Sequence, residues 1–214
     1  MKAIFSISII VIFLASSCET SPPISDFQNG IINGKVTDKT TGVPIANATV
    51  YLKGYEITGS ILTPGPTFTV ATTISDADGN FSFDFDFNSD NGYFCSAVAD
   101  QYFDYQEEFV INKSVFGGGV NVKVLLEPIA WLNLRCQNIS PYDATDEITL
   151  SYTYDGSYPN FFGISVDTTI CCVSVSGNNS NRIVWYVNKN GVETTYYEYV
   201  YCPAFDTTYY EILY

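Results

Sequence analysis

The residues available for chemistry in this chain are restricted, because its 214 residues include no histidine. This absence excludes a Ser-His-Asp triad, a Cys-His dyad and every histidine-ligated metal site. Among the carboxylates, Asp84, Asp86 and Asp90 are the best candidates, since alternate strand residues lie roughly 7 Å apart and glycosidases use paired carboxylates about 5–10 Å apart. Solvated acids on the outer face of a strand explain the same residues. We therefore expect no enzyme activity, no catalytic residue and no cofactor.

Tyrosine is the second chemically informative residue type, with 17 copies in the chain. Consecutive tyrosines in a strand cannot all point inward, so some of them must face solvent. Exposed aromatic rings with polar tips suit sugar faces and protein partners, although strand propensity and core burial also explain tyrosines. Six tyrosines are candidate ligand contacts: Tyr152, Tyr154, Tyr158, Tyr197, Tyr199 and Tyr201.

Asp76, Asp78 and Asn80 have the spacing of a calcium loop. An EF-hand needs glycine at position 6 and a bidentate glutamate at position 12, but here Gly79 falls at position 4 and Phe87 at position 12. Asp and Asn also stabilise tight turns through their own backbone. We expect a structural turn, which leaves these three residues as weak metal candidates and no metal site.

The six cysteines are unevenly distributed, with Cys136, Cys171, Cys172 and Cys202 in the second half of the chain. Four cysteines allow three pairings. Adjacent strand residues point to opposite faces, so a bond between Cys171 and Cys172 is the least expected. The favoured pattern joins one of these two to Cys136 or Cys202, and the alternative is that most are buried thiols. No CxxC pair exists, which disfavours zinc.

The elements that must position these residues are strands. Apolar and polar residues alternate with period two, most clearly over Phe81–Phe87 and Val120–Leu126, and no stretch of ten or more residues has convincing helical spacing. Short strands separated by turn signals predict an all-β fold of two tandem antiparallel β-sandwiches, transthyretin- or immunoglobulin-like.

Asn190-Gly191 is the dipeptide favoured in a type I′ hairpin. A two-residue loop pairs Trp185 with Tyr196 and places the alternating tyrosines from Tyr197 to Tyr201 on the opposite face. A three-residue loop shifts the pairing by one residue and exchanges the faces. The sequence is compatible with both loop lengths and hence with both registers.

A domain boundary is predicted near Glu127–Ile129, because Pro128 ends one strand pattern and a new one opens at Trp131. This gives one domain over residues 30–128 and a second, of unrecognised family, over residues 129–214. The link is short, so we expect the two domains to touch.

The N-terminal segment is typical of a secretory signal peptide over residues 1–17. Lys2 gives a basic start, Ile4–Leu14 is almost wholly apolar, and small residues precede Cys18. The segment is shorter than the about 20 apolar residues of a spanning helix. A cysteine in this place resembles the lipobox of bacterial lipoproteins, although Ala15 stands where that family usually has leucine.

This resemblance implies that Cys18 is acylated and becomes the mature N-terminus. Residues 18–29 then form a lipidated tether, semi-rigid at Pro22 and Pro23. The alternative is an ordinary signal peptide that leaves Cys18 as a free thiol.

The first half of the chain resembles the carboxypeptidase regulatory-like domain, a transthyretin-like sandwich. The matching segments are Gly34–Asp38, Thr41–Ile45, Ala48–Val50, Thr73–Phe81 and Gly92-Tyr93. The resemblance covers residues 30–128, and the insert Gly54–Thr67 departs from the family pattern. It implies a domain without catalytic residues, found in exported bacterial proteins that include those of glycan uptake. The whole layout also resembles two-sandwich lipoproteins of such systems.

Because the net charge is −14 and the sequence has no basic stripe, we expect no nucleic-acid partner. An anionic membrane surface would repel such a protein, so we expect attachment to a membrane through the lipid. We expect a lipid-anchored, non-enzymatic protein of the outer membrane, facing the periplasm or the cell surface. Its first sandwich is interpreted as a stalk and its second as a carbohydrate-binding or accessory module of a polysaccharide-uptake system. The alternative is a structural spacer or adaptor in an outer-membrane protein assembly.

Overall fold

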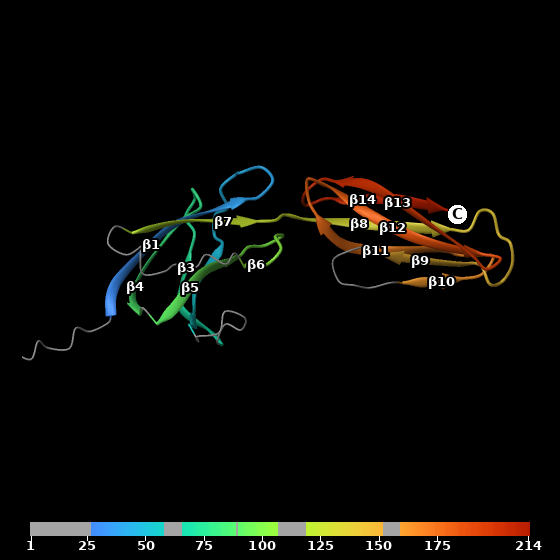
Figure 1. Ribbon diagram of the computed structural model, residues 1–214. Helices are drawn as coiled ribbons and strands as arrows, with labels where there is room; N and C mark the ends of the chain where they lie inside the picture. Colours follow the sequence, from blue (N-terminus) through green and yellow to red (C-terminus); the bar gives the residue numbers. More distant parts are fainter. Residues whose placement is uncertain (1–26, 58–65, 89, 107–118, 152–158) are drawn as a thin grey trace, which may run out of the picture.

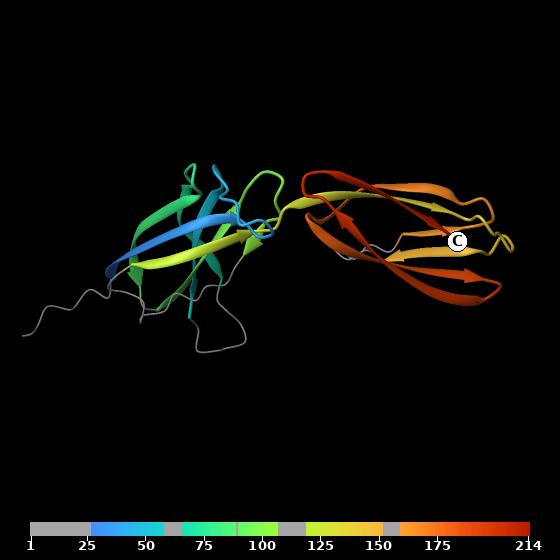
Figure 2. The same ribbon diagram turned by 90° about the horizontal axis from the view of Figure 1, so that it is seen from above.

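The computed structural model describes residues 27–57, 66–88, 90–106, 119–151 and 159–214. These residues form strands and their connections, with no helix long and apolar enough to cross a membrane among them. Two sandwiches lie end to end, β1 to β7 in the first and β8 to β14 in the second (Figures 1 and 2). The expected all-β class and tandem sandwiches are confirmed.

The first sandwich packs a three-stranded sheet against a four-stranded one. In spatial order, the sheets are β4 (Asn80–Asn88), β1 (Phe27–Asp38) and β7 (Val120–Leu126), and β3 (Thr67–Ile74), β2 (Thr49–Glu56), β5 (Asn91–Val98) and β6 (Tyr105–Gln106). Strand β4 buries Phe81, Phe83, Phe85 and Phe87, while the residues between them are exposed. This is the predicted alternation, with one face in the core.

The second sandwich has the same sizes of sheet. Its strands, again in spatial order, are β10 (Asn160–Phe162), β9 (Glu147–Ser151), β12 (Asn179–Lys189) and β13 (Val192–Cys202), and β11 (Asp167–Ser176), β8 (Ile129–Gln137) and β14 (Thr207–Leu213). Its core is mostly aliphatic, with Leu132, Leu134, Ile148, Leu150 and Ile212 buried. The core clusters of the two sandwiches share no residue.

Two strand pairs differ from the expected antiparallel arrangement. Strand β1 pairs with β7 in parallel, and β8 pairs with β14 in parallel. In each sandwich these are the first and the last strand. A parallel pair needs a long connection between its strands, here the rest of the sandwich. Local sequence patterns predict hairpins but contain no signal for such a closure.

The Asn190-Gly191 hairpin has the two-residue register. Trp185 pairs with Tyr196, and Lys189 pairs with Val192 across the loop. Asn190 and Gly191 have φ of 52° and 70°, the positive values that a type I′ turn requires at both central residues. The two-residue alternative is therefore confirmed, and it determines which tyrosines of β13 face outward.

The sandwiches meet at a polar junction around the linker. The Glu127 carboxylate accepts hydrogen bonds from Lys39 Nζ at 2.9 Å and from the Ser176 hydroxyl. Burial alone would raise the pKa of Glu127, but these two donors outweigh it and the pKa is lowered. Asn178 Nδ2 donates to Thr40 Oγ1 at 3.1 Å, a second bond from one sandwich to the other.

Backbone and ring contacts complete this junction. The Gly177 N–H donates to the Pro128 carbonyl at 2.8 Å, and a Cβ on Gly177 would lie 2.7 Å from the Ala204 Cα, so only glycine fits without a shift. The rings of Tyr102 and Phe205 make an edge-to-face contact, with centroids 5.3 Å apart. Side chains and backbone from both sandwiches thus hold the junction.

Candidate functional site

The outer face of β13 carries three of the predicted contact residues. Tyr197, Tyr199 and Tyr201 are 60%, 58% and 57% exposed. Val200, which lies between the last two, and Cys202, which follows Tyr201, are buried. Alternation along the strand explains this division. Among the described strands β13 pairs with β12 alone, so it is an edge strand of its sheet (orange-red in Figure 2). Its tyrosines therefore lie beside this edge.

The three tyrosines form an angled surface and not a flat platform. The rings of Tyr197 and Tyr199 lie at 85° to each other with centroids 6.2 Å apart. The Arg182 guanidinium lies over the Tyr197 ring at 5.0 Å from its centroid. Arg182 pairs with Tyr199 across the strands, so the hairpin register brings the cation onto this face. We call Arg182, Tyr197, Tyr199 and Tyr201 the tyrosine surface.

Arg182 was missed by the sequence analysis. Its signal was available, because the two-residue register that pairs Trp185 with Tyr196 also places Arg182 opposite Tyr199. A cation over an aromatic face restricts both side chains and adds a donor group to the surface.

A stacked aromatic pair lies on the inner face of the same hairpin, where the two-residue register predicts that Trp185 faces Tyr196. The rings of Trp185 and Tyr196 are nearly parallel, at 16°, with centroids 5.8 Å apart. Trp185 packs against the core, whereas Tyr196 is 44% exposed. The remaining predicted contacts, Tyr152, Tyr154 and Tyr158, lie outside the described residues.

The carboxylates considered for catalysis have an ordinary solvated placement. Asp84 and Asp86 are exposed on the outer face of β4, between the buried phenylalanines, and Asp90 is exposed at the start of the turn into β5. These positions match the explanation of acids on an outer face.

Asp76 uses its carboxylate to build the turn before β4. Its Oδ1 accepts the backbone N–H groups of Asp78 at 2.9 Å and Asn80 at 2.7 Å. The bond from the Asn80 backbone is the main reason that the pKa of Asp76 is lowered. Among the described residues no group of three or more His, Cys, Asp or Glu side chains is placed to hold a metal ion.

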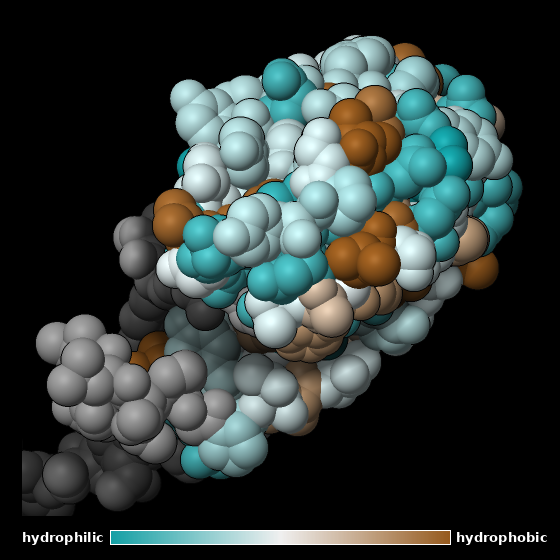
Figure 3. Space-filling view, turned by 90° about the vertical axis from the view of Figure 1, so that its right-hand side faces the viewer, coloured by the Kyte–Doolittle hydropathy of each residue, from teal (hydrophilic) through white to brown (hydrophobic). Residues whose placement is uncertain are grey.

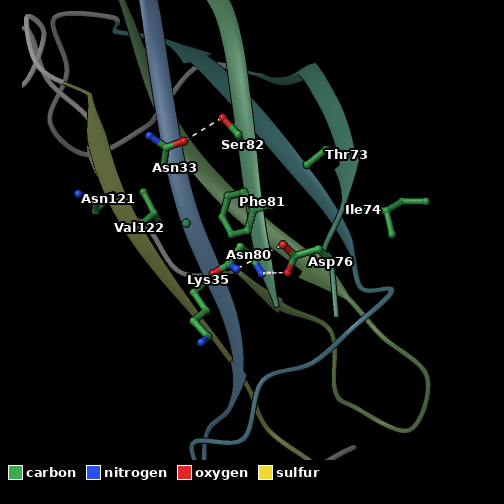
Figure 4. A pocket seen from close by; sticks show the side chains of 11 residues that line it. Asn33, Lys35, Thr73, Ile74, Asp76, Asn80, Phe81, Ser82, Asn121 and Val122 are labelled. Atoms are coloured by element: carbon green, nitrogen blue, oxygen red, sulfur yellow. Dashed lines mark hydrogen bonds between the residues drawn. The ribbon is translucent and has the colours of Figure 1, made fainter. Parts of the chain in front are cut away.

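An open hollow of about 660 Å³ lies next to this turn, between β1, β3 and β4 (Figure 4). Strand β7 also contributes to its lining, which mixes apolar residues with polar ones that include Asn33, Lys35, Asn80 and Asn121. Asn33 Oδ1 accepts a hydrogen bond from the Ser82 hydroxyl at 2.9 Å, and the Asn80 amide bonds to Asp76. Some of the polar groups that line the hollow are therefore hydrogen-bonded to one another.

The favoured disulfides are absent, and that prediction is wrong. The five cysteines in the described part of the chain are free thiols. Cys136 and Cys202 are buried in the core, whereas Cys171 and Cys172 are both exposed. The alternative of buried thiols holds for Cys95, Cys136 and Cys202.

The regular strand pairing expected at Cys171 and Cys172 is interrupted. A β-bulge in β11 shifts the register between Ile170 and Val173, so two residues stand opposite the single Asn133 of β8. The bulge interrupts the alternation of buried and exposed residues, and both cysteines are exposed.

The end of the second sandwich far from the junction exposes several apolar side chains. They lie near the ends of β8, β10 and β14 and at the start of β13: Ile139, Phe162, Ile164, Leu213 and Val192. Viewed from this end, the hydrophobic areas of the surface are separated by hydrophilic ones (Figure 3).

No protein-family model and no curated protein matches the sequence. Among solved structures, the Bacillus anthracis TIE protein is 11% identical, with a TM-score of 0.38, over 86% of this chain and 34% of that one. A point mutant of the shaft pilin SpaA of Lactobacillus rhamnosus GG is 11% identical, with a TM-score of 0.35, over 87% of this chain and 97% of that one. BcpA, the major pilin subunit of Bacillus cereus, is 12% identical, with a TM-score of 0.33, over 82% and 69%.

The chain thus spans about a third of the TIE protein. All three TM-scores are below 0.5. Similarities at this level carry no information about the function of this chain.

Proposed function

We propose that this protein is a lipid-anchored, non-enzymatic component of the cell envelope that binds glycan through the tyrosine surface, as an accessory module of a polysaccharide-uptake system. The observation that carries the proposal is the exposure of three tyrosine rings, each more than half accessible, on one face of one strand. Their hydroxyl groups remain available as hydrogen-bond donors and acceptors beside apolar ring faces.

Rings at an angle suit a chain of sugars better than one flat ligand. Alternate side chains on a strand are roughly 7 Å apart, so Tyr197, Tyr199 and Tyr201 can each contact a different part of an extended chain. Arg182 adds a cation whose N–H groups can donate to sugar hydroxyls while it remains over Tyr197.

Charge narrows the class of glycan. The protein carries a net charge of −14, which disfavours the approach of an anionic polysaccharide. We therefore propose a neutral glycan as the ligand.

Isothermal titration against a panel of neutral and anionic polysaccharides tests the proposal. Binding of at least one neutral glycan is expected, and it is expected to be lost in the triple variant Tyr197→Ala, Tyr199→Ala, Tyr201→Ala. The matched control is Tyr209→Ala, because Tyr209 is 77% exposed but lies on β14 of the other sheet. Absence of heat with every glycan, or equal loss in the control, would refute the tyrosine surface as the binding site.

The anchor is tested separately from the binding. Acylation of Cys18 predicts a mature N-terminus at that residue and recovery with the membrane fraction. Mass spectrometry of the native protein would identify the lipid, and an unmodified thiol in soluble material would contradict it.

A second candidate function is that of a structural spacer or adaptor in an outer-membrane assembly. Two observations favour it, namely the hydrogen-bonded junction and the exposed apolar side chains at the far end of the second sandwich. Pull-down with the anchor intact, repeated with Ile139→Asp and Val192→Asp, tests it. A partner lost in these variants but kept in the tyrosine variants would favour the adaptor function over glycan binding.

A further inference from the structure

We propose that Cys171 and Cys172 form a surface dithiol that binds one soft metal ion, of the Cu(I) class, between their two sulfur atoms. The two cysteines occupy the β-bulge of β11. Ile170 pairs with Leu134 and Val173 with Leu132, so two residues of β11 oppose Asn133 alone. In a regular strand, adjacent side chains point to opposite faces and cannot chelate one ion.

The backbone of the bulge is held in an uncommon conformation. Cys172 has φ of 59°, in the left-handed region that residues other than glycine rarely adopt. The Asn133 side chain supports it, because Asn133 Oδ1 accepts the Cys172 N–H at 2.8 Å. A strained residue that neighbouring groups hold in place is a frequent feature of functional sites.

A purely structural explanation accounts for only part of this. Strand β11 is at the edge of its sheet, and a bulge there discourages pairing with another strand. That role needs neither of the two thiols, and glycine or asparagine would take the φ of position 172 more easily. The choice of two exposed cysteines is the feature that remains to be explained.

Exposure distinguishes these thiols from the other cysteines of the described residues. Burial raises the pKa of Cys95 to about 12 and that of Cys136 to about 11, which keeps both as protonated thiols at neutral pH. Cys202 is also buried. The thiolate is the form that binds metals, so the accessible pair is where binding is expected.

The surroundings decide which metal fits. Soft sulfur ligands select ions such as Cu(I), Zn(II) and those of iron–sulfur clusters, and they disfavour Mg²⁺ and Ca²⁺. Structural zinc takes four protein ligands. Within the described residues no third His, Cys, Asp or Glu completes a group with this pair. Two sulfur ligands alone suit Cu(I), which accepts two-coordinate sites. Binding replaces the two thiol protons with one ion and involves no oxidation or reduction.

The test is a Cu(I) titration of the reduced full chain without oxygen, in competition with the chromogenic chelator bicinchoninate. All proteins carry Cys18→Ser, so that an unmodified Cys18 adds no thiol. One Cu(I) per chain is expected. Its affinity should fall by more than about 100-fold in Cys171→Ser and equally in Cys172→Ser. Loss of a ligand should lower the affinity more than loss of a residue that only supports a ligand. Circular dichroism checks that each variant is folded.

The matched control is Cys95→Ala, which removes a buried thiol and should keep the single Cu(I) site. X-ray absorption of the bound copper should show two sulfur neighbours. Retention of Cu(I) in a variant that combines Cys171→Ser and Cys172→Ser would overturn the proposal. Binding of one independent ion on each cysteine, or tighter binding of Zn(II) than of Cu(I), would also overturn it. Because the site lies on the opposite sheet from the tyrosine surface, its failure leaves the glycan proposal untouched.

Discussion

The two sandwiches share one plan and differ in what they expose. Each packs three strands against four, and each closes by pairing its first and last strands in parallel. The first buries aromatic rings and presents acids such as Asp84 and Asp86 on β4. The second has a mostly aliphatic core and presents tyrosines and thiols on its outer faces. Because the two sandwiches share one architecture, the fold does not distinguish them, and they differ in the side chains on their outer faces.

The largest expected effect tests whether each sandwich has a core of its own. Phe83 is 4% exposed in the first sandwich, and Phe83→Ala should cost about 3–5 kcal/mol. Both tryptophans, Trp131 and Trp185, lie in the second sandwich, so their fluorescence reports that sandwich alone. Denaturation should show an earlier transition by circular dichroism and an almost unchanged one by tryptophan fluorescence. A common shift of both signals would mean that the two cores unfold as one unit.

The second prediction concerns the close packing around Gly177 at the junction. Gly177→Ala places a Cβ 2.7 Å from the Ala204 Cα, and such overpacking typically costs about 1–3 kcal/mol. The loss should appear in the tryptophan signal, because Gly177 and Ala204 both belong to the second sandwich. Ser180→Ala, at an exposed site on β12, is the control and should leave the transition in place. Equal behaviour of the two variants would contradict the close approach.

A smaller effect concerns pH. The pKa of Glu127 in the folded protein is below its usual value of about 4.3, so folding favours the charged carboxylate. The charged carboxylate therefore stabilises the fold above that pH. This contribution is lost as the pH falls through the pKa of the folded state. Its partner Lys39 is half exposed, so the expected contribution is about 1 kcal/mol or less. Denaturation at pH values from 6 down to 3 should show a shallower loss of stability for Glu127→Gln than for the native chain. Parallel curves would exclude a contribution from this group.

The smallest effect sharpens the distinction between buried and exposed tyrosines. Tyr199→Ser, on the tyrosine surface, should change the free energy of unfolding by no more than about 0.5 kcal/mol. Tyr93→Ser is the comparison, since Tyr93 is 2% exposed and its hydroxyl accepts the Asn88 N–H at 2.9 Å. Thermal melts of the two variants should differ clearly. A large loss in Tyr199→Ser would give that residue a structural role in place of a binding one.

Sequence patterns predicted the features that depend on near neighbours. The alternation from Phe81 to Phe87 identified a strand with one buried face, and Asn190-Gly191 identified a hairpin whose possible registers could be enumerated. The same local rule failed at Cys171 and Cys172, because a bulge depends on the opposing strand and on Asn133, which is 39 residues away from Cys172. Arg182 was missed for a related reason, since its contact with Tyr197 follows from the register.

The parallel pairing of first and last strands has a mechanical consequence. In each sandwich the chain enters at one end and leaves at the other, and β7 runs on into β8 along the same line (Figure 1). Tension applied between the two termini would therefore slide β1 along β7 and β8 along β14. The hydrogen bonds of each pair would resist this shear together, whereas an antiparallel closing pair pulled from one end would unzip bond by bond.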